Sequence, residues 1–154
     1  MADEREAIFD WLQTVIADVD DVAFVSRNAR QLLIGQVSEF PGVFLLDLGD
    51  TEAEAETPQR GINEWLLNVG IVLAYKGTSN DSTEESAPGE AAALLRKIRK
   101  QVYDTISDGN VGQVVDSFRD KGKSHLSFPP LGPKTAVQAT LCEFRYLEDK
   151  TFPD

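Results

Sequence analysis

The most regular pattern in the sequence is an alternation of apolar and polar side chains over residues 62–76. Every second residue there is apolar or aromatic, namely Trp65, Leu67, Val69, Ile71, Leu73 and Tyr75. The positions between them are more polar and include Glu64, Asn68 and Lys76. Because successive side chains of a strand point to opposite faces, this period of two predicts a long β-strand with one apolar face. Gly70 and the β-branched residues disfavour a buried helix over the same stretch.

A strand of this length needs other strands beside it and a layer that covers its apolar face. Two amphipathic helices, predicted over about residues 3–19 and 88–107, provide that layer because their apolar side chains recur at helical spacing. In the first helix these side chains are Ile8, Trp11, Leu12, Val15, Ile16 and Val19. In the second they are Ala91, Leu94, Leu95, Ile98, Val102 and Ile106.

Shorter strands are predicted over residues 22–25, 43–48 and 135–147, and residues 125–128 are a candidate for another. Residues 28–37 fit either a short helix or an irregular crossing. In the last strand the apolar positions change face near Leu141, which predicts a bulge or a strand covered on both sides. The order of elements predicts an α+β fold, with a mostly antiparallel sheet and two amphipathic helices packed on one face.

A chain of 154 residues is expected to form a single domain over residues 1–154. Two polar stretches, residues 49–61 and 77–89, lack apolar anchors and are expected to be mobile loops. The side chains expected to anchor the core are Trp11, Val15, Trp65, Leu67, Ile71, Leu95 and Ile98.

The residues that carry most enzyme chemistry are scarce. The single histidine, His125, has no cysteine near it at zinc-binding spacing, and the single cysteine, Cys142, lies in an apolar strand and is expected to pack in the core. Asp18, Asp20 and Asp21 lack the spacing of a calcium-binding loop. No phosphate-binding loop or nucleophile elbow is present. We therefore expect no catalytic, cofactor or metal site, and a protein that is not an enzyme.

The charge of the chain limits its partners. It holds 26 acidic and 15 basic residues, for a formal net charge of −11. This charge argues against binding to nucleic acid or to an anionic membrane. The basic cluster at Arg96, Lys97, Arg99 and Lys100 is spread around its helix, and no exposed aromatic residue is expected among them. One cysteine, no apolar run long enough to span a bilayer and no signal peptide lead us to expect a cytoplasmic domain.

Four features in order resemble the tail terminator family of long-tailed bacteriophages, whose members are also called tail completion or minor tail proteins. The first is the N-terminal amphipathic helix, and the second is the segment Phe-Pro-Gly-Val-Phe-Leu-Leu-Asp-Leu-Gly-Asp at residues 40–50. The third is the long apolar strand at residues 63–75, followed by a polar loop and the helix at residues 91–106. The fourth is the closing strand at residues 136–146, which ends in an aromatic residue.

The resemblance implies an assembly protein of the virion tail, present in the host cytoplasm during assembly. Members of the family form a hexameric ring that caps the tail tube, ends its polymerisation and docks to the head connector or neck proteins. In contractile tails the ring also touches the sheath protein, and DNA passes through the ring without specific binding. The helices generally face outward and the sheet lines the channel. Candidate channel or docking residues are Asp47, Asp50, Glu52, Glu54, Glu56, Asp81, Glu84 and Glu85.

Two other functions fit the sequence. One is a head–tail adaptor or another neck protein, which shares the size, acidity and α+β makeup. The other is a small cytoplasmic ligand-binding or regulatory α+β module built around loop carboxylates such as Asp47 and Glu54. Binding to tail tubes or to filled heads, and saturable binding of a small molecule, separate the three functions.

Overall fold

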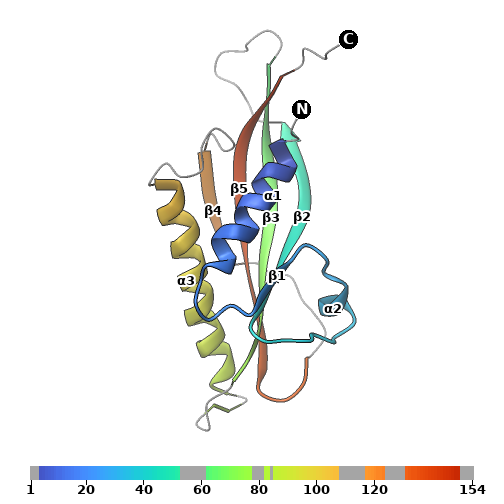
Figure 1. The fold of residues 1–154 in the computed structure, drawn as a ribbon, viewed down its shortest axis with the longest axis vertical. Coiled ribbons are helices and arrows are strands. Elements are labelled where there is room, and N and C mark those ends of the chain that lie inside the picture. Colours follow the sequence, from blue (N-terminus) through green and yellow to red (C-terminus); the bar gives the residue numbers. More distant parts are fainter. Residues whose placement is uncertain are drawn as a thin grey trace.

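The computed structural model describes residues 4–52, 62–77, 82–83, 85–107, 117–123 and 131–149. Within these ranges the chain forms helices and a mixed, mostly antiparallel sheet (Figure 1). In chain order the elements are α1 (Glu4–Ala17), β1 (Phe24–Ser26), α2 (Arg30–Leu33), β2 (Gly42–Glu52), β3 (Ile62–Lys76), α3 (Ala87–Ser107), β4 (Ser117–Lys123) and β5 (Thr135–Asp149).

The sheet has five strands in the order β1-β2-β3-β5-β4. Only the β1–β2 pair is parallel, and the other three pairs are antiparallel. At the centre, β3 and β5 pair without a register shift from Ile62 opposite Asp149 to Lys76 opposite Thr135. The alternating pattern at residues 62–76 therefore predicted both ends of β3, and the α+β class is confirmed.

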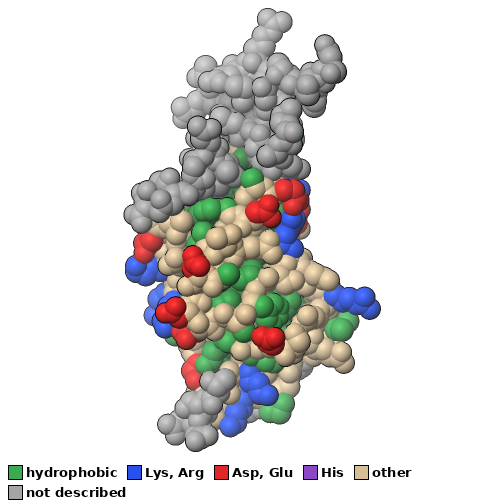
Figure 2. All heavy atoms as spheres, in the orientation of Figure 1, with side chains coloured by type: hydrophobic (Ala, Val, Ile, Leu, Met, Phe, Trp, Pro, Cys, Tyr) green, Lys and Arg blue, Asp and Glu red, His purple; other side chains and the backbone are tan. Residues whose placement is uncertain are grey.

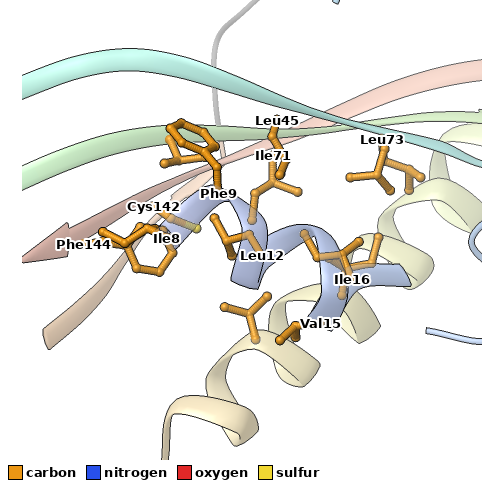
Figure 3. Close-up of a cluster of buried hydrophobic side chains, with 14 of the residues drawn as sticks. Ile8, Phe9, Leu12, Val15, Ile16, Leu45, Ile71, Leu73, Cys142 and Phe144 are labelled. Carbon is orange, nitrogen blue, oxygen red and sulfur yellow. The ribbon is translucent and has the colours of Figure 1, made fainter. Parts of the chain in front are cut away.

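The two long helices pack on the same face of the sheet and bury one cluster of apolar side chains. Ile8, Phe9, Leu12 and Ile16 of α1 are fully buried against Ile71, Leu73, Cys142 and Phe144 of the sheet (Figure 3). Of the seven predicted core anchors, five are buried: Val15, Leu67, Ile71, Leu95 and Ile98. Trp11 and Trp65 are partly buried against the same cluster, and the Trp11 ring meets the Phe144 ring edge-on at a centroid distance of 6.2 Å.

A second, smaller cluster lies on the opposite face of the sheet. Leu32 of α2 packs there with Phe44, Val72, Ala74 and Ala139, so the segment that contains α2 covers this part of the face. The strand β5 thus has buried residues on both sides, with Ala139 in this cluster and Cys142 in the larger one. This double cover accounts for the change of apolar face near Leu141, since the pairing of β5 with β3 is regular.

Most element boundaries shift by one or two residues from those predicted, and three differences are larger or add an element. The strand β2 continues to Glu52, so residues 49–52 are strand and not loop, because their backbone still pairs with β3 as far as Trp65. The helix α3 begins at Ala87, which shortens the second predicted loop. The strand β4 lies at residues 117–123, where no strand was predicted, while the candidate strand at residues 125–128 falls outside the described residues. Residues 53–61 of the first predicted loop and residues 78–81 and 84 of the second also lie outside them.

Candidate functional site

A bulge in β2 determines where the first acidic candidates lie. Asp47 pairs with Val69 and Asp50 pairs with Leu67, so two residues of β2, Leu48 and Gly49, stand opposite a single residue of β3. Residues three apart in a regular strand point to opposite faces, but the extra residue restores the same face for both aspartates. That face is the one covered by the helices, because Val69 and Leu67 belong to the larger core cluster.

The bulge is closed by backbone and side-chain contacts. Gly49 has a φ of +90°, a conformation that other residues seldom adopt, and its N–H donates to Asp47 Oδ1 at 2.9 Å. Asn68, the residue opposite the bulge, donates from Nδ2 to the Gly49 carbonyl at 3.3 Å and to Thr51 Oγ1 at 3.1 Å. The sequence therefore has a glycine at the one position of the bulge where the backbone requires it.

Arg5 of α1 lies between the two aspartates. Its Nη2 is 2.6 Å from Asp47 Oδ2 and its Nε is 2.7 Å from Asp50 Oδ2. Burial alone would raise the pKa of Asp47, but the hydrogen bonds from Arg5 and Gly49 lower it below its ordinary value. The contacts with Asp47 and Asp50 raise the pKa of Arg5, and the hydrogen bond to Asp47 contributes most. These ion pairs attach the first turns of α1 to the distal part of β2.

The structure brings together two of the eight acidic candidates, Asp47 and Asp50. Glu85 is exposed in the turn before α3, far along the chain from the bulge. The side chains of Glu52, Glu54, Glu56, Asp81 and Glu84 lie outside the described residues. Arg5 is a partner of these aspartates that the sequence did not reveal, since it stands 42 residues before Asp47.

A second contact fixes the start of α1 against β1 and the turn that follows. The Arg27 guanidinium pairs with the Glu6 carboxylate and stands over the Phe9 ring, with Arg27 Cζ 4.0 Å from the ring centroid. Figure 2 shows the result on the face covered by α1, where acidic and basic side chains lie next to one another. Three carboxylates near the start of α1, those of Glu6, Asp47 and Asp50, are therefore paired with arginine.

An open groove of about 420 Å³ lies beside the first half of α3. Its apolar lining comes from Pro41, Tyr75, Ala93 and Leu94, and its charged rim from Asp21, Lys76, Glu90 and Lys97. At the rim, Lys97 Nζ is 3.3 Å from Asp21 Oδ2.

Glu90 organises the other side of the groove. Its carboxylate accepts hydrogen bonds from the hydroxyls of Ser82 at 2.8 Å, Ser86 at 2.9 Å and Tyr75 at 3.4 Å. The two serine hydroxyls hold the pKa of Glu90 below its ordinary value. Burial, together with the Glu90 charge, raises the pKa of Tyr75. These hydrogen bonds connect Ser82, Ser86 and Tyr75 to Glu90 of α3.

In the part of the chain that the structure describes, four large apolar side chains are exposed: Leu33, Ile34, Leu48 and Tyr103. Tyr103 is 60% exposed and lies on α3 at helical spacing from Arg96 and Lys100, so the expectation that no exposed aromatic residue stands among the basic ones is wrong. Lys100 itself pairs with Asp104 at 2.5 Å. This surface of α3 is thus mixed in charge, in spite of its basic sequence.

No group of three or more histidine, cysteine or acidic side chains within the described ranges is placed to hold a metal ion. None of the helices in those ranges is long and apolar enough to cross a membrane. Comparison with known proteins gives no family model that matches the chain and no curated relative with significant similarity. The fold and its surfaces therefore carry the functional argument.

Proposed function

We propose that this chain is a non-enzymatic assembly protein of a long-tailed bacteriophage, which forms a ring that caps the tail tube and docks to the head connector. The observation that carries the proposal is the asymmetry of the sheet. Both long helices cover one face, whereas among the described residues α2 and its flanking segment cover only part of the other. A subunit built in this way can turn its helices outward and present a sheet face to a channel or to its neighbours.

The second face of the sheet also has an apolar row that crosses the strands. Leu46 of β2, Gly70 of β3 and Leu141 of β5 stand opposite one another in the strand pairing. The side chains of Leu46 and Leu48 lean over Gly70, where an added Cβ would lie 3.4 Å from Leu46 Cβ and 3.5 Å from Leu48 Cδ1. Leu48 remains 44% exposed. Partly exposed leucines on a sheet face support a role in assembly, because such surfaces commonly mark protein contacts.

The net charge supports the passage of DNA through the ring. Six copies carry a formal charge of 6 × −11 = −66. A ring of this sign repels phosphate over the Debye length of about 8 Å at physiological ionic strength. Asp47 and Asp50 would not line the channel of such a ring, because they lie on the face that the helices cover. The proposed partners are other copies of the chain, the tail tube protein, the head connector or neck proteins, and the sheath protein where the tail contracts.

The test is to mix the purified chain with tail tubes of its own phage and to follow its mass by light scattering and its shape by negative-stain microscopy. We expect rings of six subunits, either free or at one end of each tube, and tubes that stop elongating when the chain is added. A monomer that neither binds tubes nor stops their growth would refute the proposal.

The head–tail adaptor is the alternative within the same particle, and it predicts binding to DNA-filled heads in place of tube ends. The ligand-binding module is less well supported by the site. One oxygen of Asp47 accepts from Gly49 and the other from Arg5, so this carboxylate is already engaged. The same mixing experiment, repeated with filled heads, separates the terminator from the adaptor.

A further inference from the structure

The segment that contains α2 carries two adjacent aliphatic side chains on its outer surface. Leu33 is 63% exposed and Ile34 is 56% exposed, although both are large and fully apolar. We call this pair the Leu33–Ile34 knob. Figure 1 places α2 at the edge of the molecule, and in Figure 2 apolar and basic side chains project together there. A single exposed leucine is ordinary on a protein surface, but two in succession on one projection mark a contact.

The buried residue before the knob and hydrogen bonds at both ends of α2 hold the knob in place. Leu32, the residue before it, is fully buried in the cluster on the second face of the sheet. The Arg30 N–H donates to Asn28 Oδ1 at 3.0 Å at the start of α2, and the Gln36 N–H donates to the Gln31 carbonyl at 2.8 Å after its end. Gly35, with a φ of +72°, ends the helix. A contact group that is already ordered loses little conformational entropy on binding.

The groove beside α3 has the properties that such a knob requires. Its lining by Pro41, Ala93 and Leu94 is apolar, and its volume of about 420 Å³ lies in the range of natural binding sites. Next to it runs the acidic loop after α1, where Asp18, Asp20 and Asp21 are all exposed. Arg30, exposed beside the knob, carries the complementary charge.

The knob and the groove lie on opposite faces of the sheet. Leu32 beneath the knob belongs to the cluster on the second face, whereas Leu94 in the groove belongs to the cluster under the long helices. Because the knob and the groove lie on different faces, the knob of one molecule binds the groove of the next in a head-to-tail arrangement. A repeated head-to-tail contact closes into a ring when the rotation between neighbouring molecules divides a full turn evenly.

We propose that the Leu33–Ile34 knob of one chain inserts into the Pro41–Ala93–Leu94 groove of a second copy, with Arg30 facing the acidic loop at residues 18–21 of that copy. The inference rests on the proposed ring, for which it supplies the contact between neighbouring subunits. The knob acts as the buried centre of the interface, and the surrounding surface completes the area of about 1,200–2,000 Å² that a stable contact needs.

Cysteine pairs test the contact directly. Ile34→Cys and Ala93→Cys chains are mixed and oxidised, and disulfide-linked dimers are measured on non-reducing gels. Cys142 is 2% exposed and does not compete for the link. We expect a linked dimer from the mixture and a ladder of higher oligomers from the double variant, since a disulfide needs Cα atoms about 4.4–6.8 Å apart. A mixture of Tyr103→Cys and Ala93→Cys is the matched control, because Tyr103 is about as exposed as Ile34, and it should give only background.

Charge substitution at the knob gives an independent measurement. A chain with Leu33→Glu and Ile34→Glu should associate at least about 30-fold more weakly, from the apolar area removed at two sites. Tyr103→Glu, at a side chain of similar exposure, should leave association unchanged. All three side chains are exposed, so thermal melting of each variant should match the parent chain and exclude unfolding as the cause.

The outcomes separate the two proposals. If rings form on tubes but the disulfide between positions 34 and 93 does not, the knob contact is wrong and the ring proposal stands. The same conclusion follows if the chain with Leu33→Glu and Ile34→Glu assembles fully. The link without any binding to tubes supports the contact and overturns the tail terminator. Failure of both the link and the ring overturns both proposals.

Discussion

Replacing Arg5 by alanine tests whether charge holds α1 to the bulge of β2. The substitution leaves Asp47 and Asp50 without the guanidinium that now lies 2.6 Å and 2.7 Å from their Oδ2 atoms. The three side chains are 22–37% exposed, so the loss falls between that of a surface pair and that of a fully buried one. We expect the free energy of unfolding to fall by about 1–2 kcal/mol at pH 7, measured by urea denaturation.

The pH dependence of this loss identifies its cause. The pKa of Asp47 is lower in the folded chain than in the unfolded chain, so the unfolded state binds more protons as the pH falls. The contribution of Asp47 is thus complete above its unfolded pKa of about 3.9 and disappears as the pH falls through the folded value. The difference between the parent chain and Arg5→Ala should therefore shrink towards zero near the acid limit at which the parent still folds.

Lys97→Ala provides the matched control. Its pair with Asp21 joins two side chains that are 65% and 61% exposed, and removing it should cost less than about 0.5 kcal/mol. An Arg5→Ala chain that is equally destabilised at pH 7 and at low pH would refute the electrostatic explanation. The stem of Arg5 would then act by packing alone.

Three further substitutions or measurements test the fold. Gly49→Val should lower the free energy of unfolding by about 1–2 kcal/mol. The loss should come from backbone strain alone, because a Cβ at this φ of +90° meets no atom within 4 Å. Unchanged stability in urea would exclude the positive φ. Ile71→Ala should lower the free energy of unfolding by about 2–5 kcal/mol, whereas Leu33→Ala on the surface should change it by less than about 0.5 kcal/mol. Equal losses would contradict the assigned core. The Cys142 thiol should react with a thiol reagent only at the rate of unfolding, and rapid labelling under native conditions would show that β5 opens locally.

Periodic side-chain patterns predicted the central elements well. The alternation at residues 62–76 defined β3 to the residue, and the helical stripes located α1 and α3 to within a few residues. These patterns are visible in the sequence because each element buries one face, and burial selects apolar residues at the period of the element.

The elements that the sequence missed are held by their neighbours instead. The polar end of β2 remains a strand because its backbone pairs with β3, and β4, at the sheet edge, pairs with β5 although its sequence Ser-Phe-Arg-Asp-Lys-Gly-Lys has no alternation. The pairing of Arg5 with Asp47 joins residues far apart in sequence, so no local spacing predicts it. The bulge at Gly49 then decides the face of Asp50, which a regular strand would have turned away.

The central position of β5 sets the order in which this chain can fold. It is the strand nearest the C-terminus among those described, yet it lies between β3 and β4 and supplies Cys142, Phe144 and Tyr146 to the main core. Its pairing with β3 joins Ile62 to Asp149, and contacts of such long sequence separation form slowly. During synthesis, one edge of β3 therefore remains unpaired until β5 leaves the ribosome. A chain that stops before residue 135 would keep that edge open to pairing with other molecules, so aggregation is the expected fate of truncated copies.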